Sequence, residues 1–289
     1  MKHPIKQAVD FEGHSILSKT RREGHITRST DGGSLEGLVS FKAGHTRASG
    51  SKVEKTDAWG NVHSGWVTLS TSVLEGLNVF EVITADRVVA QVSTEHPVVD
   101  GHVPKVTFLG TRFENLRVGG YPVEVQLDLG ICGQKPAGDK PYLEDLGFLD
   151  RVEQRFAGIA DAASAPESLK DAYKCKIAYI DKLKKGERNG CSKLVCSLVK
   201  SIAPIPIPGV EIFGNLILIP DFGTVALGEI EVGIERGHLD FPDKQLASVS
   251  DDPPSSNYFT LNMLNMHLGC IGGGAVMAAT AKTNGMTRP

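Results

Sequence analysis

Strict alternation of apolar and polar residues constrains this chain more than any other feature. The strings VVAQV (residues 88–92), PVEVQLDL (122–129) and EIEVGIE (229–235) all place apolar side chains at every second position, which is the period of a half-buried strand. Gly, Pro, Asn and Asp interrupt such strings at short intervals, as in antiparallel β domains. The inward-facing residues are predicted to be Val88, Ala90, Val92, Val123, Val125, Leu127, Leu129, Ile230, Val232 and Ile234.

The period changes between about residues 141 and 200. Apolar residues there recur at steps of three and four, which predicts two amphipathic helices that begin near Pro141 and near Ser164 and Pro166. Residues 193–202 fit a strand or a short helix equally well, and we favour a strand. The two predicted apolar stripes consist of Leu146, Leu149, Val152, Phe156 and Ile159, and of Leu169, Tyr173, Ile177, Ile180 and Leu183.

Together these patterns predict a mainly β fold, an antiparallel sandwich or partly closed barrel with a two-helix insertion at about 141–200. Residues 1–33 are polar and partly basic, and we expect them to form a flexible N-terminal arm. Residues 34–289 would then form a single β domain. A β-solenoid is the alternative, because a repeated unit of regular length could form a stacked coil.

An internal repeat supports that alternative and the sandwich alike. Residues 67–79 (VTLSTSVLEGLNV) and 106–118 (VTFLGTRFENLRV) align without gaps, and LEGLVSF (35–41) and FGNL (213–216) echo parts of them. We interpret this as a duplicated β unit. Gly76, Asn115 and Asn215 interrupt the alternation at matching places, which predicts bulges or tight bends with positive φ.

Composition excludes several classes of protein. The 289 residues are 40% hydrophobic and 22% charged, with a formal net charge of −3, so a disordered or collagen-like chain is excluded. Such a charge lacks the basic surface that nucleic-acid binding needs, so we expect no nucleic-acid partner. No apolar run is long enough for a transmembrane helix, and no secretory signal is visible. We therefore expect a cytoplasmic location, or an extracellular or surface location after non-classical export.

The five cysteines are not spaced as in metal-binding motifs. Free thiols in a reducing compartment are expected, with a Cys191–Cys196 or Cys132–Cys175 bridge as the alternative in an exported protein.

Three blocks of the chain resemble a known group of proteins. They are STSVLEGLNVFEVITADRVVAQVSTEHP (70–97), RFENLRVGGYPVEVQLD (112–128) and VEIFGNLILIPDFGTVALGEIEV (210–232). Their order is similar to that in a bacterial group of β-rich proteins that includes those labelled choice-of-anchor P family. The resemblance implies a β fold and no particular chemistry, and many members of that group are exported or attached to the surface.

Carboxylates and histidines are the candidates for acid–base catalysis. Asp86, Glu95, His96 and Glu114 could form a carboxylate–histidine pair, if matching bends of the repeat lie at one edge. Arg87, Asn115 and Arg117 belong to the same bends and are candidate ligand-binding residues. A surface network of ion pairs is the alternative for all of them.

A metal ion could bind on the loop after residue 95. His96, Asp100 and His102 offer ligands at close spacing there, although the spacing matches no standard pattern. Solvated loop histidines without a cofactor are the alternative. Trp59 and Trp66 lie close together in the sequence and could stack on a sugar or another ligand, or else cover the edge of the core.

These observations lead to three hypotheses about function. The first is a non-enzymatic binding or structural protein, with self-association through β edges or the helical insertion. The second is an enzyme of hydrolase or isomerase type, and the third is a carbohydrate-binding module. A small molecule, a glycan, a protein or a second copy of the chain would be the partner.

Overall fold

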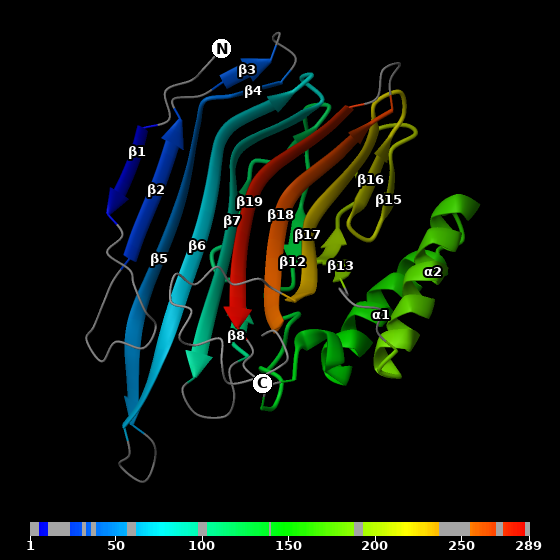
Figure 1. Cartoon of the computed structure of the whole chain (residues 1–289). Coiled ribbons are helices and arrows are strands. Elements are labelled where there is room, and N and C mark those ends of the chain that lie inside the picture. Colours follow the sequence, from blue (N-terminus) through cyan, green and yellow to red (C-terminus); the bar gives the residue numbers. More distant parts are fainter. Residues whose placement is uncertain are drawn as a thin grey trace.

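The computed structural model describes residues 6–10, 24–30, 33–35, 39–56, 62–97, 103–138, 140–187, 193–236, 255–269 and 274–286. Two large antiparallel sheets dominate them, and a pair of helices lies beside the smaller sheet (Figure 1). All the strand pairs among these residues are antiparallel, and the two large sheets share no strand, which fits the predicted sandwich with a helical insertion. A stacked coil, the alternative, would pair its successive turns in parallel.

The larger sheet has eleven strands, with the order β1-β2-β5-β6-β7-β10-β11 along its main path. The strand β4 pairs with β3 and β6, while β8 and β9 pair with the edge of β7 that β6 leaves free. The strands are β1 (Lys6–Asp10), β2 (Gly24–Thr30), β3 (Gly33–Leu35), β4 (Val39–Phe41), β5 (Ala43–Thr56), β6 (Val62–Val79), β7 (Ile83–Pro97), β8 (Lys105–Thr107), β9 (Arg112–Glu114), β10 (Arg117–Val118) and β11 (Tyr121–Pro122).

The smaller sheet has six strands in the order β15-β16-β17-β18-β19, and β13 pairs with β17 beyond the end of β16. A separate two-stranded sheet joins β12 to β14. These strands are β12 (Val125–Leu127), β13 (Lys193–Ser197), β14 (Val199–Ile202), β15 (Glu211–Phe213), β16 (Leu216–Ile219), β17 (Gly223–Arg236), β18 (Ser255–Leu268) and β19 (Gly274–Met286).

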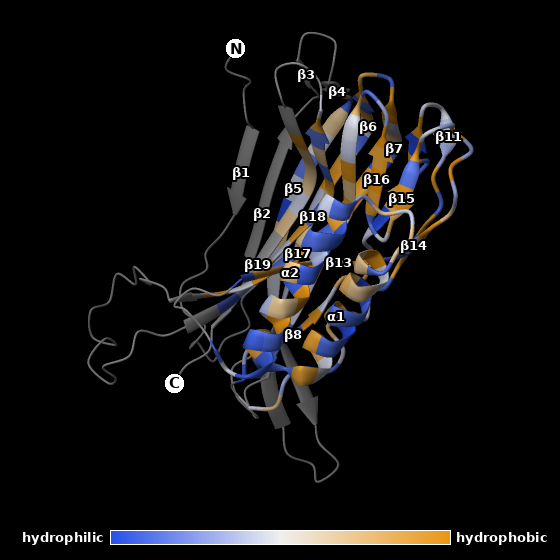
Figure 2. Cartoon of the chain, turned by 90° about the vertical axis from the view of Figure 1, so that its right-hand side faces the viewer, coloured by the Kyte–Doolittle hydropathy of each residue, from blue (hydrophilic) through white to orange (hydrophobic). Residues whose placement is uncertain are grey.

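The insertion contains a 3₁₀ turn, η1 (Tyr142–Glu144), and the helices α1 (Leu146–Ala160) and α2 (Glu167–Lys184). The side chain of Asp145 caps α1 by accepting a 2.6 Å hydrogen bond from the Phe148 amide. The predicted stripes are buried or packed against the core, except that Leu146 is 57% exposed because it begins α1 and points into solvent. Figure 2 shows hydrophilic residues along α2 and mostly hydrophobic ones in β15 and β16.

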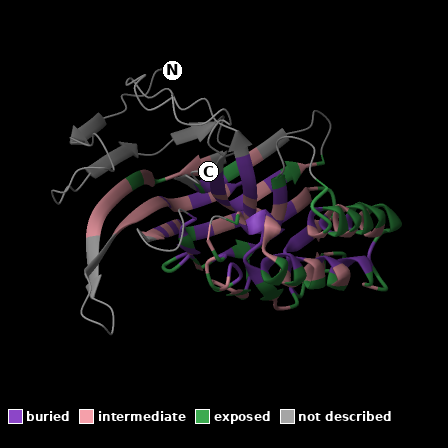
Figure 3. Ribbon diagram, turned by 60° about the horizontal axis from the view of Figure 1, so that its bottom comes forward, coloured by how far each residue is buried: buried purple, intermediate pink, exposed green. Residues whose placement is uncertain are grey.

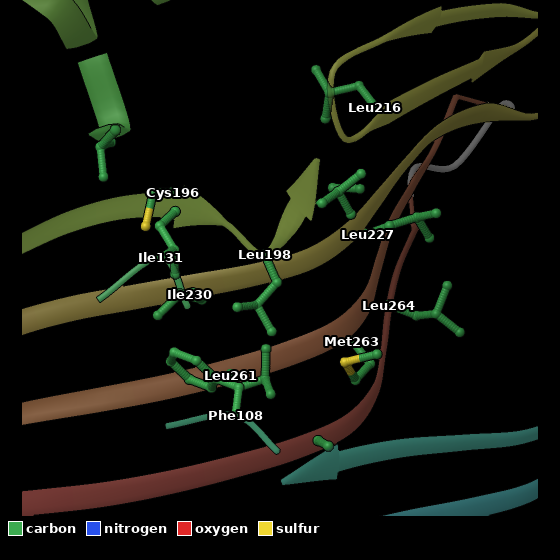
Figure 4. Close-up of a cluster of buried hydrophobic side chains, with 14 of the residues drawn as sticks. Phe108, Ile131, Cys196, Leu198, Leu216, Leu227, Ile230, Leu261, Met263 and Leu264 are labelled. Atoms are coloured by element: carbon green, nitrogen blue, oxygen red, sulfur yellow. The ribbon is translucent and has the colours of Figure 1, made fainter. Parts of the chain in front are cut away.

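The core lies where β19 and β18 pack on β6 and β7. Figure 3 shows buried residues through the central strands and exposed ones along the helices, and Figure 4 shows the part of the core around Leu261 and Met263. The predicted alternation is confirmed for β7 and β17, whose Val88, Ala90, Val92, Ile230, Val232 and Ile234 are buried. In the string 122–129, Val123 is buried and the other three apolar residues are half-buried.

Bulges shift the inward face of several strands by one position. Gly76 in β6 has a φ of 62°, and the pairing of β6 with β7 skips it together with Asp86. As a result, Ala85 and Val88 are both buried although they are three positions apart, a spacing that puts side chains on opposite faces of a regular strand. The positive φ predicted at Gly76 and Asn115 is confirmed, whereas the φ of 60° in the FGNL turn belongs to Gly214 and not to Asn215.

The predicted duplication of one β unit is wrong. Residues 67–79 lie within the continuous strand β6, whereas 106–118 are divided among β8, a turn closed by a hydrogen bond from the Thr111 amide to the Phe108 carbonyl, β9 and β10. The two segments flank β7 from opposite sides. The similar residues therefore do not adopt a common backbone conformation.

Two further expectations concern the termini and the cysteines. The strands β1 and β2 lie within the expected N-terminal arm and pair with each other, and β2 also pairs with β5. The other residues before Gly33 lie outside the described ones, so the domain boundary stays a prediction. Cys132, Cys175 and Cys196 are free thiols, so neither of the two bridges considered is present.

Candidate functional site

The turn between β6 and β7 presents an aromatic side chain at one end of the sandwich. The Val82 amide donates to the Val79 carbonyl at 3.0 Å, and the two residues between them, Phe80 and Glu81, have φ values of 52° and 59°. Such turns favour Asn, Asp and Gly, since most other residues are strained at positive φ. The Asn78 side chain supports the turn by accepting a 2.8 Å bond from the Glu81 amide.

The turn between β16 and β17 lies at the same end of the molecule (Figure 1). Its Phe222 amide donates to the Ile219 carbonyl at 3.2 Å, with Pro220 and Asp221 between them. Asp221 has a φ of 58°, at the position where a turn that begins with Pro favours Gly or Asn. The Gly269 amide donates to the Phe222 carbonyl at 2.9 Å and ties the end of β18 to this turn.

The two turns enclose an apolar groove of about 450 Å³. Phe80 and Val82 line it from the first turn, residues 219–222 from the second, and Leu268 from β18. The rings of Phe80 and Phe222 meet edge to face with their centroids 6.2 Å apart, so both sheets contribute to one surface. The volume lies within the range of small-molecule sites.

The sequence analysis did not identify this groove. The signal was present, because both turns combine an acidic residue with an apolar aromatic one, FEV at 80–82 and PDF at 220–222. Both strings belong to the blocks that carry the resemblance, but nothing local shows that they meet.

The predicted catalytic residues do not assemble into one site. Asp86 and His96 lie on the same strand β7, ten positions apart, which corresponds to roughly 30 Å. Glu95 pairs with Val67 and Lys105, and as the direct neighbour of His96 it points to the other face of the sheet.

The residues predicted at the bends do meet, as an ion-pair ladder. Arg87 lies between Glu75 of β6 and Glu114 of β9, with 3.3 Å from its Nε to the Glu75 carboxylate. Asn115 donates a 2.6 Å hydrogen bond to Asp86. Arg117 instead donates to the Gly120 carbonyl at 3.0 Å. This arrangement matches the surface network that the sequence analysis kept as the alternative.

His96 lies in a polar row on the inward face of β6 and β7. Its Nε2 is 3.0 Å from Thr94 Oγ1, and Thr94 in turn contacts the Thr68 hydroxyl. Trp66 is directly opposite His96 in the register. Burial lowers the pKa of His96 below its usual value, which favours the neutral ring.

The predicted metal and tryptophan sites are only partly visible. Asp100, His102 and Trp59 lie outside the described residues. Within the described ranges, no three His, Cys, Asp or Glu residues are grouped so that they could hold a metal ion. The metal site at His96 and His102 and the stacking of Trp59 and Trp66 stay predictions.

Comparisons with known proteins identify the family. The model of a family described as a domain of unknown function (DUF8256) matches residues 1–233, so the chain belongs to that family. Searches of curated proteins and of solved structures found no match. In the part of the chain that the structure describes, neither helix has the length and apolar character needed to span a membrane.

Proposed function

We propose that this chain is a non-enzymatic binding protein that holds a small apolar molecule in the groove between the two turns. The observation that carries the proposal is the backbone of those turns. Phe80 and Glu81 adopt positive φ where Asn or Gly would be unstrained, at a cost of about 1 kcal/mol for each residue. Asp221 also has a positive φ, which Asp tolerates better than most residues. Strained backbone of this kind concentrates at functional sites.

The Phe80 side chain, which the strained turn presents at the groove, supports the same function. Phe80 is 36% exposed, so part of its ring is open to solvent at the tip of the hairpin. The turn thus gives up stability and places an aromatic ring over an apolar groove. A purely structural turn would gain stability from Asn-Gly at the same two positions.

The alternatives have less support. An enzyme using Asp86 and His96 would need the two side chains in one site, but about ten residues of strand separate them. For a carbohydrate-binding module, Trp66 faces the inner side of the sheet, in register with His96. Self-association stays a prediction, for which the strand β19 offers an edge: among the described residues, β19 pairs with no strand other than β18.

The test is binding of a neutral apolar dye, N-phenyl-1-naphthylamine, followed by its fluorescence. We expect saturable binding to the wild-type protein and at least fivefold weaker binding to Phe80→Ser, because the variant removes one wall of the groove. Phe80 lies at the surface, so the variant should keep its fold, which circular dichroism checks.

Leu109→Ser is the matched control. Leu109 is 64% exposed in another turn of the larger sheet, so it is a more accessible apolar side chain than Phe80. Unchanged binding to this variant would assign the dye to the groove. Equal loss in both variants, or equal binding to Phe80→Ser and the wild type, would overturn the proposal.

A further inference from the structure

The ionisable residues of the two turns carry one sign of charge. Glu81 in the first turn and Asp221 in the second are acidic, and neither turn contains a basic residue. Both side chains are exposed, and among the described residues neither carboxylate has a basic partner. In contrast, the acidic residues of the bend ladder, such as Glu75 and Glu114, are paired with arginines.

The two carboxylates lie in or next to the turns that form the groove. Asp221 itself lines the groove, and Glu81 is flanked by two residues that line it, Phe80 and Val82. The remaining walls are apolar. A molecule in this groove therefore meets hydrophobic side chains along its body and the unpaired Asp221 carboxylate at the rim, with Glu81 in the adjoining turn.

From this arrangement we propose that the groove selects small amphiphilic cations, in which an alkyl chain or ring carries an ammonium group. The inference rests on the proposed function, since it names the class of ligand for the same groove. The apolar part lies against Phe80, Phe222 and Leu268, and the ammonium lies at the rim near Asp221. An amphiphilic anion of the same size is repelled by the same carboxylates.

The experiment compares three probes that each carry an eight-carbon alkyl chain: octyltrimethylammonium, octanol and octyl sulfate. Their binding is measured by isothermal titration calorimetry below their micellar concentrations. We expect the cation to bind about fivefold more tightly than octanol, because exposed charges in water attract each other only weakly. We expect the anion to bind least. The preference should shrink in 1 M NaCl, because screening then acts over about 3 Å.

The variant Glu81→Gln/Asp221→Asn removes both charges and keeps the shape of the turns, since Asn tolerates positive φ. It should bind all three probes alike, at the affinity of octanol. Asp171→Asn is the matched control, because Asp171 is an exposed carboxylate on α2, in the helical insertion, and it should leave the preference for the cation unchanged.

The outcomes separate this inference from the proposed function. Equal binding of the three probes to the wild type, with loss in Phe80→Ser, would overturn the cation preference and leave the apolar groove standing. A preference that survives in Glu81→Gln/Asp221→Asn would also overturn it. No binding of any probe would overturn both.

Discussion

Single residues with positive φ separate into two groups in this structure. Among the described residues, Phe80, Glu81, Asn115, Asp221 and Ala279 are the non-glycine examples. Asn115 and Ala279 lie at bulges, where the pairing of strands is interrupted. The other three border the apolar groove. At this scale, positive φ at the bulges accompanies a change of strand face, whereas positive φ at the turns accompanies side chains that line or adjoin the groove.

One residue, His96, should make the stability of the protein depend on pH. Burial lowers the pKa of His96 in the folded state below the usual 6.5, so the unfolded chain binds a proton more readily. Stability should therefore fall as the pH drops through about 6.5, by at most about 1.4 kcal/mol per pH unit for one proton. Urea unfolding of the wild type and His96→Gln between pH 7.5 and 5.5 measures the difference.

Glutamine keeps a hydrogen-bonding group for the Thr94 hydroxyl, and the other histidines titrate equally in both proteins. A smaller fall in the variant is the expected result. Parallel pH profiles would show that His96 does not contribute.

At the scale of elements, one arginine joins the helical insertion to the strands on both sides of it. Arg155 of α1 donates to the carbonyls of Ser197 and Val199, at 2.7 and 2.9 Å, and forms an ion pair with Asp128. These acceptors lie after β12 and around the bend between β13 and β14. The guanidinium thus fixes the helix against the strands that precede and follow it.

Replacing Arg155 by lysine should lower the free energy of unfolding by about 2 kcal/mol. A single ammonium cannot reproduce the planar set of donors that reaches two carbonyls and a carboxylate, and hydrogen bonds to charged groups contribute about 1.5–3 kcal/mol. Chemical denaturation measures the change. Lys174→Met, which removes a 57% exposed partner of surface ion pairs, is the control and should leave stability nearly unchanged, because water screens exposed ion pairs. Equal effects in the two variants would contradict the role of Arg155.

At the scale of the whole molecule, Tyr142 connects parts of the chain that are distant in sequence. Its hydroxyl donates to the Pro104 carbonyl at 3.1 Å and accepts from the Val106 amide at 3.2 Å, at the start of β8. Its ring meets Phe148 of α1 and Phe259 of β18 edge to face, at 5.9 and 5.0 Å. The larger sheet, the insertion and the smaller sheet therefore share one buried residue.

Tyr142→Phe should destabilise the protein by about 1–3 kcal/mol. The variant keeps the ring contacts but leaves a buried amide and a buried carbonyl without their partner. A lower melting temperature with an unchanged far-ultraviolet circular dichroism spectrum is the expected result. A melting temperature equal to that of the wild type would show that the hydroxyl is dispensable.

The sequence by itself determined the local structure of this protein. Alternation predicted the inward face of β7 and β17, and the three- and four-residue steps predicted α1 and α2, because each periodicity is a property of one element. Positive φ at Gly76 and Asn115 was also predictable, because few residue types tolerate it and both residues are of such a type. The ion-pair ladder was partly predictable, because the sequence analysis kept a surface network of ion pairs as the alternative for these charged residues.

Only the tertiary structure decided which of these elements are neighbours. The similar segments 67–79 and 106–118 flank β7 and do not repeat one fold, and the turns at Phe80 and Asp221 meet although they are far apart along the chain. Asp86 and His96, which are close in sequence, are separated by the length of a strand. The physical reason is that an extended strand moves nearby residues apart, whereas the packing of two sheets brings distant turns together.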